Sequence, residues 1–121
     1  MEFKDYQQSV LCTEAKEPHP ERATEHWRTL HGAIGLSTEA GELLDQMKKV
    51  VYYGRKLDKQ NLREEIGDVM WHVALLCGAN GFDLGEILAA NKAKLQARYG
   101  GVFSLDKAEN RDLTAEMAAL G

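Results

Sequence analysis

Apolar residues recur every three or four positions along most of the chain, which is the spacing of one face of an α-helix. The pattern predicts a first helix over about residues 2–15, which the two prolines of "EPHPE" bring to an end. A second helix begins in the 20s and runs to about Tyr53, and Gly54 suits its C-terminal cap. The apolar stripe of this helix consists of Ala33, Leu36, Ala40, Leu43, Leu44, Met47, Val50 and Val51.

Further helices follow the turn "GRKLDKQ". The third ends at "GANGFD", and its stripe consists of Leu62, Ile66, Val69, Met70, Val73, Leu76 and Cys77. Asp83 and Glu86 form a capping pair for a fourth helix through Tyr99, and Asp106 and Glu109 form another for a short last helix to about Leu120. No segment alternates as a strand does. The sequence therefore predicts an all-α bundle of four main helices plus a short C-terminal helix.

Length and charge narrow the classes of protein to consider. The 121 residues suit one domain, residues 1–121. A net charge of −4 is unfavourable for binding a phosphate backbone, so we expect no nucleic-acid partner. No apolar run has the length of a membrane span, and the start "MEFKDYQQ" lacks the features of a secretory signal. We expect a cytoplasmic protein in which Cys12 and Cys77 stay reduced.

Two stretches repeat one arrangement of acids around a glycine. "LSTEAGELL" holds Glu39 and Glu42, and "LREEIGDVM" holds Glu65 and Asp68. At about 100° per residue, both pairs fall at about 260° and 200°, measured from Ala40 on one helix and from Ile66 on the other, and so border the apolar stripes. A short connection makes the two helices antiparallel neighbours. We therefore expect the four carboxylates to converge at the edge of the core.

Converging carboxylates repel one another unless cations neutralise them. Oxygen-only ligands suit hard ions, so the rows predict a site for Mg²⁺ or Mn²⁺. Gly41 and Gly67 each cost about 1 kcal/mol relative to alanine within a helix, and close approach of backbone or ligand would explain them. A single pair of this kind is usually a solvated helix flank. Its repetition at the same angle favours the metal site.

The fourth helix carries a polar row beside its core positions. Asn91, Lys94 and Arg98 fall within a sector about 60° wide. Lysine and arginine often extend from such borders towards water, but three donors in one row also suit phosphate oxygens. Near the start of the second helix, Trp27 and His31 suit stacking on a base and core packing equally well.

These motifs together resemble a known family. "GLSTEAGELL", "NLREEIGDVMW" and "NKAKLQARYGGVFSLDKAENRD" are similar to the MazG-like branch of the all-α nucleoside triphosphate pyrophosphohydrolases, whose signature is E-x-x-E followed on the next helix by E-x-x-D. The similarity covers residues 30–112. Relatives often carry a proline after the tyrosine, where this chain has Gly100 and Gly101.

The resemblance implies Mg²⁺-dependent hydrolysis of a nucleoside triphosphate between the α and β phosphates, as nucleotide-pool housekeeping. One of the acids, with Glu39 the candidate, would orient the attacking water. The resemblance also implies a homodimer or homotetramer. The metal ligands would be Glu39, Glu42, Glu65 and Asp68, and the substrate-binding residues Asn91, Lys94, Arg98 and Tyr99.

Three other functions fit a helical bundle of this kind. Phosphoribosyl-ATP pyrophosphohydrolase shares the fold and the reaction type, and the ending "FSLDKAENRD" favours the housekeeping role over it. A non-catalytic helical interaction module would use the acids only for solubility. A redox di-iron bundle needs Glu-x-x-His on its ligand helices, and none of the four histidines has a glutamate three positions before it.

Overall fold

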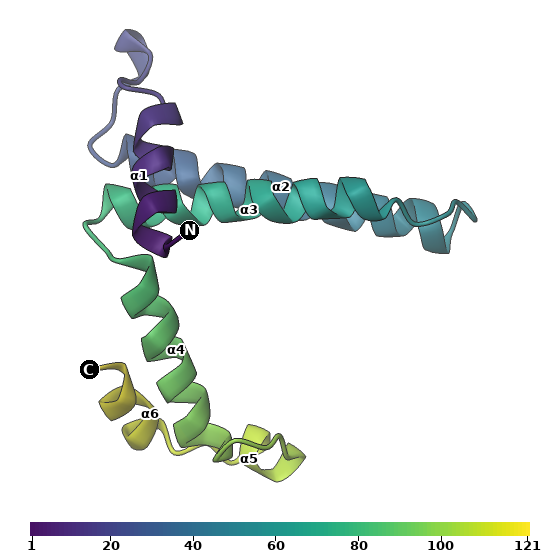
Figure 1. The fold of residues 1–121 in the computed structure, drawn as a ribbon, viewed down its shortest axis with the longest axis vertical. Coiled ribbons are helices and arrows are strands. Elements are labelled where there is room, and N and C mark those ends of the chain that lie inside the picture. The colour runs from purple at the N-terminus through teal and green to yellow at the C-terminus, as the bar shows by residue number, and fades with distance from the viewer. The chain divides into compact units, whose positions relative to one another are not determined.

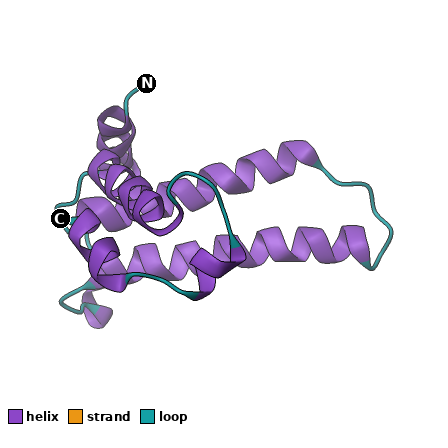
Figure 2. Cartoon of the chain, turned by 90° about the horizontal axis from the view of Figure 1, so that it is seen from below, coloured by secondary structure: helices purple, strands orange, loops and turns teal.

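The computed structural model describes all of residues 1–121, and every regular element in it is a helix (Figure 2). The predicted all-α fold is therefore confirmed. Contacts divide the chain into two compact units, Met1–Gly81 and Phe82–Gly121, so the assignment of a single domain stays a prediction. The elements are α1 (Phe3–Thr13), the 3₁₀ turn η1 (Pro20–Arg22), α2 (Trp27–Val51), α3 (Lys59–Ala79), α4 (Leu84–Tyr99), α5 (Leu105–Glu109) and α6 (Leu113–Leu120).

The predicted bounds of the first four main helices agree with the structure to within a few residues. α1 ends at Thr13, before the two prolines, and Pro20 begins η1, which the pattern did not predict. Gly54, just past α2, has φ 67°, a left-handed conformation that glycine adopts without strain. None of the helices alone has the length and apolar character to cross a membrane, although α3 and α4 taken as one broken segment would pass by length and composition.

The first unit is built on an antiparallel hairpin of α2 and α3, which lie side by side along their length (Figure 1). Two glycines let the helices approach closely near the start of α2. A Cβ atom on Gly35 would lie 2.0 Å from the His72 ring, and one on Gly32 would lie 2.7 Å from Leu76 Cγ. A larger residue at either position would therefore require His72 or Leu76 to move.

The face of α2 that packs on α3 differs from the predicted stripe. With successive residues taken as about 100° apart, the centre of the observed contact side lies about 75° from the centre of the predicted stripe, in the direction of the acids. The buried and half-buried residues of that side are Gly32, Gly35, Leu36, Glu39, Leu43, Gln46 and Val50. The outer half of the predicted stripe is wrong as a core assignment, because these residues are exposed: Ala33, Ala40, Leu44, Met47 and Val51 of α2, and Ile66 of α3.

The hydrophobic core of the first unit is small and lies where α1 crosses α3 (Figure 1). Val10 of α1 packs with Ala74 and Leu75 of α3, and all three are nearly inaccessible to solvent. Trp71 covers this cluster and its indole Nε1 donates a hydrogen bond to Thr13 Oγ1 at 2.9 Å. These contacts hold α1 across the hairpin.

The second unit pairs α4 with α6 and places α5 between them in sequence. Asp83 caps α4 as predicted, since its carboxylate accepts a hydrogen bond from the Glu86 amide at 2.9 Å. The predicted capping pair Asp106 and Glu109 is wrong: Ser104 caps α5, and Asp106 lies within that helix. The side chain of Asn110 donates to the backbone carbonyl of Asp106 at 3.2 Å, the same carbonyl that accepts the Asn110 amide, and α5 ends at this point.

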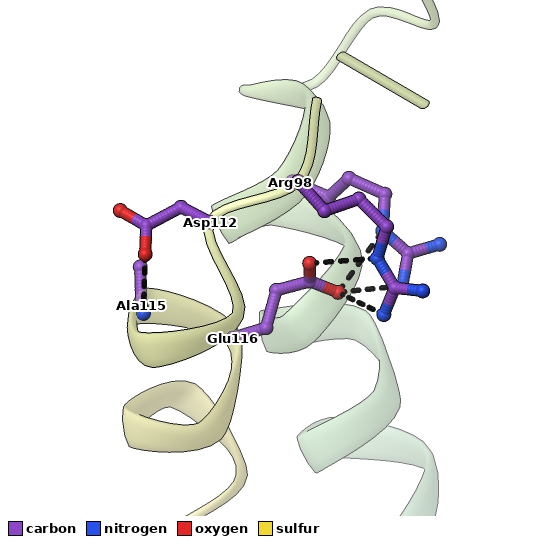
Figure 3. A network of polar contacts seen from close by, with 5 residues as sticks. Arg98, Asp112, Ala115 and Glu116 are labelled. Carbon is purple, nitrogen blue, oxygen red and sulfur yellow. Dashed lines mark hydrogen bonds and ion pairs between the residues drawn. The ribbon is translucent and has the colours of Figure 1, made fainter. Parts of the chain in front are cut away.

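A buried carboxylate holds the second unit together. Glu116 is 2% exposed and accepts hydrogen bonds from Arg98 Nε at 3.0 Å and Arg111 Nη2 at 2.9 Å (Figure 3). These two guanidinium groups, first Arg111 and then Arg98, lower the pKa of Glu116 from 4.5 to about 2. Asp112, which caps α6 through the amide of Ala115, starts the helix that presents Glu116.

The Glu116 cluster predicts acid sensitivity. A carboxyl group with a folded-state pKa of about 2 stabilises the fold above its unfolded value near 4.5 and loses that contribution as the pH falls to 2. We expect the melting temperature of the wild type to fall between pH 5 and pH 2.5. Glu116→Gln should melt lower at pH 7 and show a flatter pH profile, measured by circular dichroism. Parallel profiles for the two proteins would contradict this account.

Candidate metal centre

Glu39 of α2 and Glu65 of α3 face each other within the helix interface, and Glu42 lies one turn further along α2. One carboxylate oxygen from each of the three lies within 4.8 Å of the others. The rotation of the contact side helps to bring them together, because it moves Glu39 from the border of the interface to its centre, whereas Glu42 stays exposed at the edge. The structure thus places three of the four predicted metal ligands in one cluster.

Two oxygens of this cluster are buried without any partner. Oε2 of Glu39 and Oε2 of Glu65 are inaccessible to solvent and accept no hydrogen bond. The pKa of Glu65 is raised, first by its hydrogen-bonding contact with Glu42 and then by burial. A carboxylate that is desolvated beside a second carboxylate is unfavourable unless a cation or a proton compensates.

The donors fit a hard divalent cation. All of them are carboxylate oxygens, the ligand type that Mg²⁺ and Mn²⁺ prefer, and no histidine or cysteine belongs to the cluster. Glu65 Oε1 also accepts a hydrogen bond from Asn61 Nδ2 at 3.4 Å, and Asn61 Oδ1 accepts one from Gln46 Nε2 at 2.5 Å. This chain of amides orients one ligand while leaving its second oxygen for a metal.

Asp68, the fourth predicted ligand, lies outside the cluster. Its side chain is exposed, and its negative charge, after burial, raises the pKa of Tyr6. Its backbone carbonyl contacts His72 Nδ1 at 2.9 Å. Asp68 still acts electrostatically on Glu65 one turn away, so its role as a ligand stays a prediction.

Gly41 and Gly67 are not sites of close approach within the chain. A Cβ atom added at either position would meet no heavy atom within 4 Å. The close contacts occur instead at Gly32 and Gly35, which the sequence pattern did not single out. His31 belongs to a stack with the rings of Trp71 and His72, whose centroids lie 5.9 and 6.0 Å away, so its packing role is the one observed.

A cavity of about 440 Å³ lies beside the cluster, between α2, α3 and the loop that joins them. Glu42 and Glu65 form part of its wall. Three cationic side chains, Lys49, Arg55 and Lys56, also line it. Sequence periodicity did not single out these cations. The signal available was their position, with Lys49 in the last turn of the helix that carries two of the acids and Arg55 and Lys56 in the loop directly after it.

The predicted phosphate-binding residues all lie on α4, in the second unit. Asn91 is exposed, and Lys94 is half-buried. Arg98 is already paired with Glu116 and lies 5.6 Å from the centroid of the Tyr99 ring. Tyr99 also packs on Phe103, with centroids 5.5 Å apart. These four assignments stay predictions.

Comparison with known proteins agrees with the arrangement of the acids. The family described as the MazG nucleotide pyrophosphohydrolase domain matches residues 31–103, a range that contains all eight predicted site residues. The chain is 36% identical over 72 residues to the Gene 37 protein of Mycobacterium phage L5. That alignment covers 54% of this chain and 60% of the phage protein, so the chain spans about 60% of that relative's length. No solved structure matches.

The shielded carboxylate oxygens predict that Glu65→Gln raises the melting temperature without metal and lowers the stabilisation that metal gives. Glu65→Gln removes a charge that is unfavourable in the metal-free protein, so we expect it to melt a few degrees higher than the wild type in EDTA at pH 8. The same variant should lose most of the rise in melting temperature that Mg²⁺ gives the wild type. Differential scanning fluorimetry measures both.

The matched control is Glu64→Gln. Glu64 is exposed, bonds only to Gln60 at 3.4 Å and lies outside the cluster. It should leave both the metal-free melting temperature and the response to Mg²⁺ close to the wild-type values. A Glu65→Gln protein that keeps the full response to Mg²⁺ would remove Glu65 from the ligand set.

Proposed function

The chain belongs to the MazG nucleotide pyrophosphohydrolase family, and from that membership and the acidic centre we propose that it hydrolyses nucleoside triphosphates to monophosphates and pyrophosphate with Mg²⁺ or Mn²⁺. The observation that carries the proposal is the pair of orphaned oxygens on Glu39 and Glu65 within an oxygen-only cluster. A module that used its acids only for solubility would place them in water.

In the proposed reaction a water oxygen bonds to the α-phosphorus, and the bond from that phosphorus to the bridging oxygen breaks. Pyrophosphate leaves with the bonding electron pair. When bound, Mg²⁺ supplies positive charge that polarises the phosphoryl oxygens and stabilises the leaving group. Glu42 and Glu65 of the cluster, together with Asp68 as the sequence pattern predicts, would hold the metal. Glu39, whose Oε2 has no other partner, orients the water and accepts its proton.

Asn91, Lys94, Arg98 and Tyr99 of α4, which the sequence pattern assigns to the substrate, are proposed here to bind it. Asn91 and Lys94 are free of any ion pair in the structure and offer N–H groups to phosphate oxygens. Arg98 uses Nε and Nη2 for Glu116, so Glu116 positions its guanidinium and leaves Nη1 for a phosphate. Tyr99 contacts the sugar or the base. The net charge of −4 favours this small substrate over nucleic acid. We further propose that the protein acts in the cytoplasm.

The uncovered apolar face of the hairpin supports assembly into a homodimer or homotetramer. Leu44 is 73% exposed, Val51 64% and Ile66 51%, although the sequence pattern places all three in a core stripe. A second hairpin of the same kind offers an equivalent apolar face, and self-complementary surfaces are typical of twofold dimers. Contact with another copy would remove these apolar side chains from water, which the single chain does not do.

Substitution of a ligand tests the activity. We expect Glu42→Gln and Asp68→Asn to lower Mg²⁺-dependent pyrophosphate release by at least about a hundredfold, because each removes a negative oxygen from the metal. Helical content by circular dichroism should not change, since both side chains are exposed. Glu64→Gln is the control and should retain activity. Near-normal turnover in either ligand variant would remove that residue from the site.

Substitution on the apolar face tests the assembly. Leu44→Glu places a charge on the proposed contact surface, so we expect it to shift the protein to a lower oligomeric state by sedimentation velocity. Leu113→Glu is the control, because Leu113 is similarly exposed at 61% but belongs to the second unit. An unchanged sedimentation coefficient in Leu44→Glu would place the contact elsewhere.

A further inference from the structure

The cavity beside the acids has a cationic end that the proposed mechanism leaves unused. Lys49 lies in the last turn of α2, and Arg55 and Lys56 follow in the loop before α3. We call these three residues the hairpin cations. They share one cavity with Glu42 and Glu65, so positive side chains and the metal centre lie along the same wall.

The backbone fixes the hairpin cations at this end. Gly54 adopts φ 67° and lets the chain turn sharply after α2. The amide of Arg55 then donates a hydrogen bond to the carbonyl of Lys49 at 3.1 Å, which ties the loop back onto the helix. On α2 itself, Lys49 follows Glu42 by seven residues, which places it on nearly the same face about 10 Å further along the axis.

Two of the three cations have no partner within the chain. Lys49 Nζ pairs with Asp45 Oδ2 at 3.0 Å, whereas the side chains of Arg55 and Lys56 form no ion pair. Gln46 also lines the cavity, and its Nε2 donates a hydrogen bond to Asn61 Oδ1, so this polar wall is held in place by contacts within the chain.

Charge balance makes the cavity suited to an anion only after a metal has bound. Four carboxylates line it, from Glu42, Asp45, Asp58 and Glu65, against the three hairpin cations. One divalent cation reverses that balance to net positive. The volume of about 440 Å³ lies within the range of small-molecule sites, so a metal and a polyphosphate fit together.

We propose that the hairpin cations bind the pyrophosphate portion of the substrate, its β and γ phosphates, while the acids hold the metal at the other end of the cavity. The inference rests on the proposed function and assigns one part of the substrate within it. Arg55 contributes bidentate hydrogen bonds, and Lys49 and Lys56 contribute point charges. The leaving group thereby meets positive charge from the first unit, independently of Arg98, which is engaged by Glu116.

Calorimetry with inorganic pyrophosphate and Mg²⁺ tests the site without requiring turnover. We expect the double variant Arg55→Gln/Lys56→Gln to bind pyrophosphate at least about tenfold more weakly than the wild type, as loss of one charge-assisted contact does. The matched control is Lys48→Gln/Lys59→Gln, which removes the same charge from neighbouring residues outside the cavity. Its affinity should change less than about threefold. Equal weakening in both doubles would overturn the proposal.

Two further arms identify the ligand. In EDTA, pyrophosphate should not bind, and binding of equal strength there would place the anion away from the acids and overturn the assignment. A triphosphate with a non-hydrolysable α,β bridge should lose affinity in parallel with pyrophosphate in Arg55→Gln/Lys56→Gln. If only pyrophosphate loses affinity, the cavity is a site for free polyphosphate and the proposal is overturned.

The inference and the proposed function fail in distinguishable ways. Turnover by the wild type with unchanged pyrophosphate affinity in Arg55→Gln/Lys56→Gln would refute the role of the hairpin cations and leave the hydrolase activity standing. Selective loss of pyrophosphate and triphosphate binding in that variant, with no turnover by the wild type, would support the anion site and refute the hydrolase activity.

Discussion

The organisation of this protein depends on two half-buried carboxylates, from Glu39 and Glu65, each of which has one oxygen shielded from solvent within a helix interface. Such an arrangement is unfavourable by itself, since burial and mutual repulsion both oppose ionisation. It persists because neighbouring parts of the hairpin fix it. Gly32 and Gly35 let α3 approach α2 through His72 and Leu76, and that register places the two glutamates opposite each other. A metal at this point would turn the least favourable contact of the hairpin into a stabilising one.

The same constraint explains why so little of the hairpin's apolar surface is buried. A helix has one face to place against its neighbour, and here that face includes polar ligands. The purely apolar sector lies about 100° away and is left uncovered. Site geometry and assembly are therefore linked in this fold: turning α2 to bury Leu44 and Val51 against α3 would carry Glu39 out of the interface.

Sequence periodicity predicted the helices well because each has a clear stop, such as the prolines after α1 and Gly54 after α2. It also placed Glu39 and Glu65 at equivalent angles, and they do meet. Periodicity did not predict which helix or molecule packs against a given helix face. Apolar spacing identifies a stripe but not whether α3 or another molecule covers it. Periodicity missed the break between α5 and α6, where the Asn110 side chain bonds to the backbone carbonyl of Asp106. It also could not show that Arg98 pairs with a buried carboxylate, because Glu116 lies on a different helix.

The acids and the cations of this chain are positioned in different ways. Family membership therefore says more about the acids than about the groups that bind the substrate. The acids are positioned by the register of α2 and α3, which brings Glu39, Glu42 and Glu65 together within the range that the family match covers. Cations are subject to no such requirement, because any positive group that reaches a phosphate contributes. In this chain Arg98 neutralises Glu116 and stabilises the second unit, whereas Arg55 and Lys56 remain unpaired beside the acids. Positive charge that already compensates a buried carboxylate is less available to a substrate, so the unpaired cations of the hairpin loop are better placed to determine how the leaving group is held.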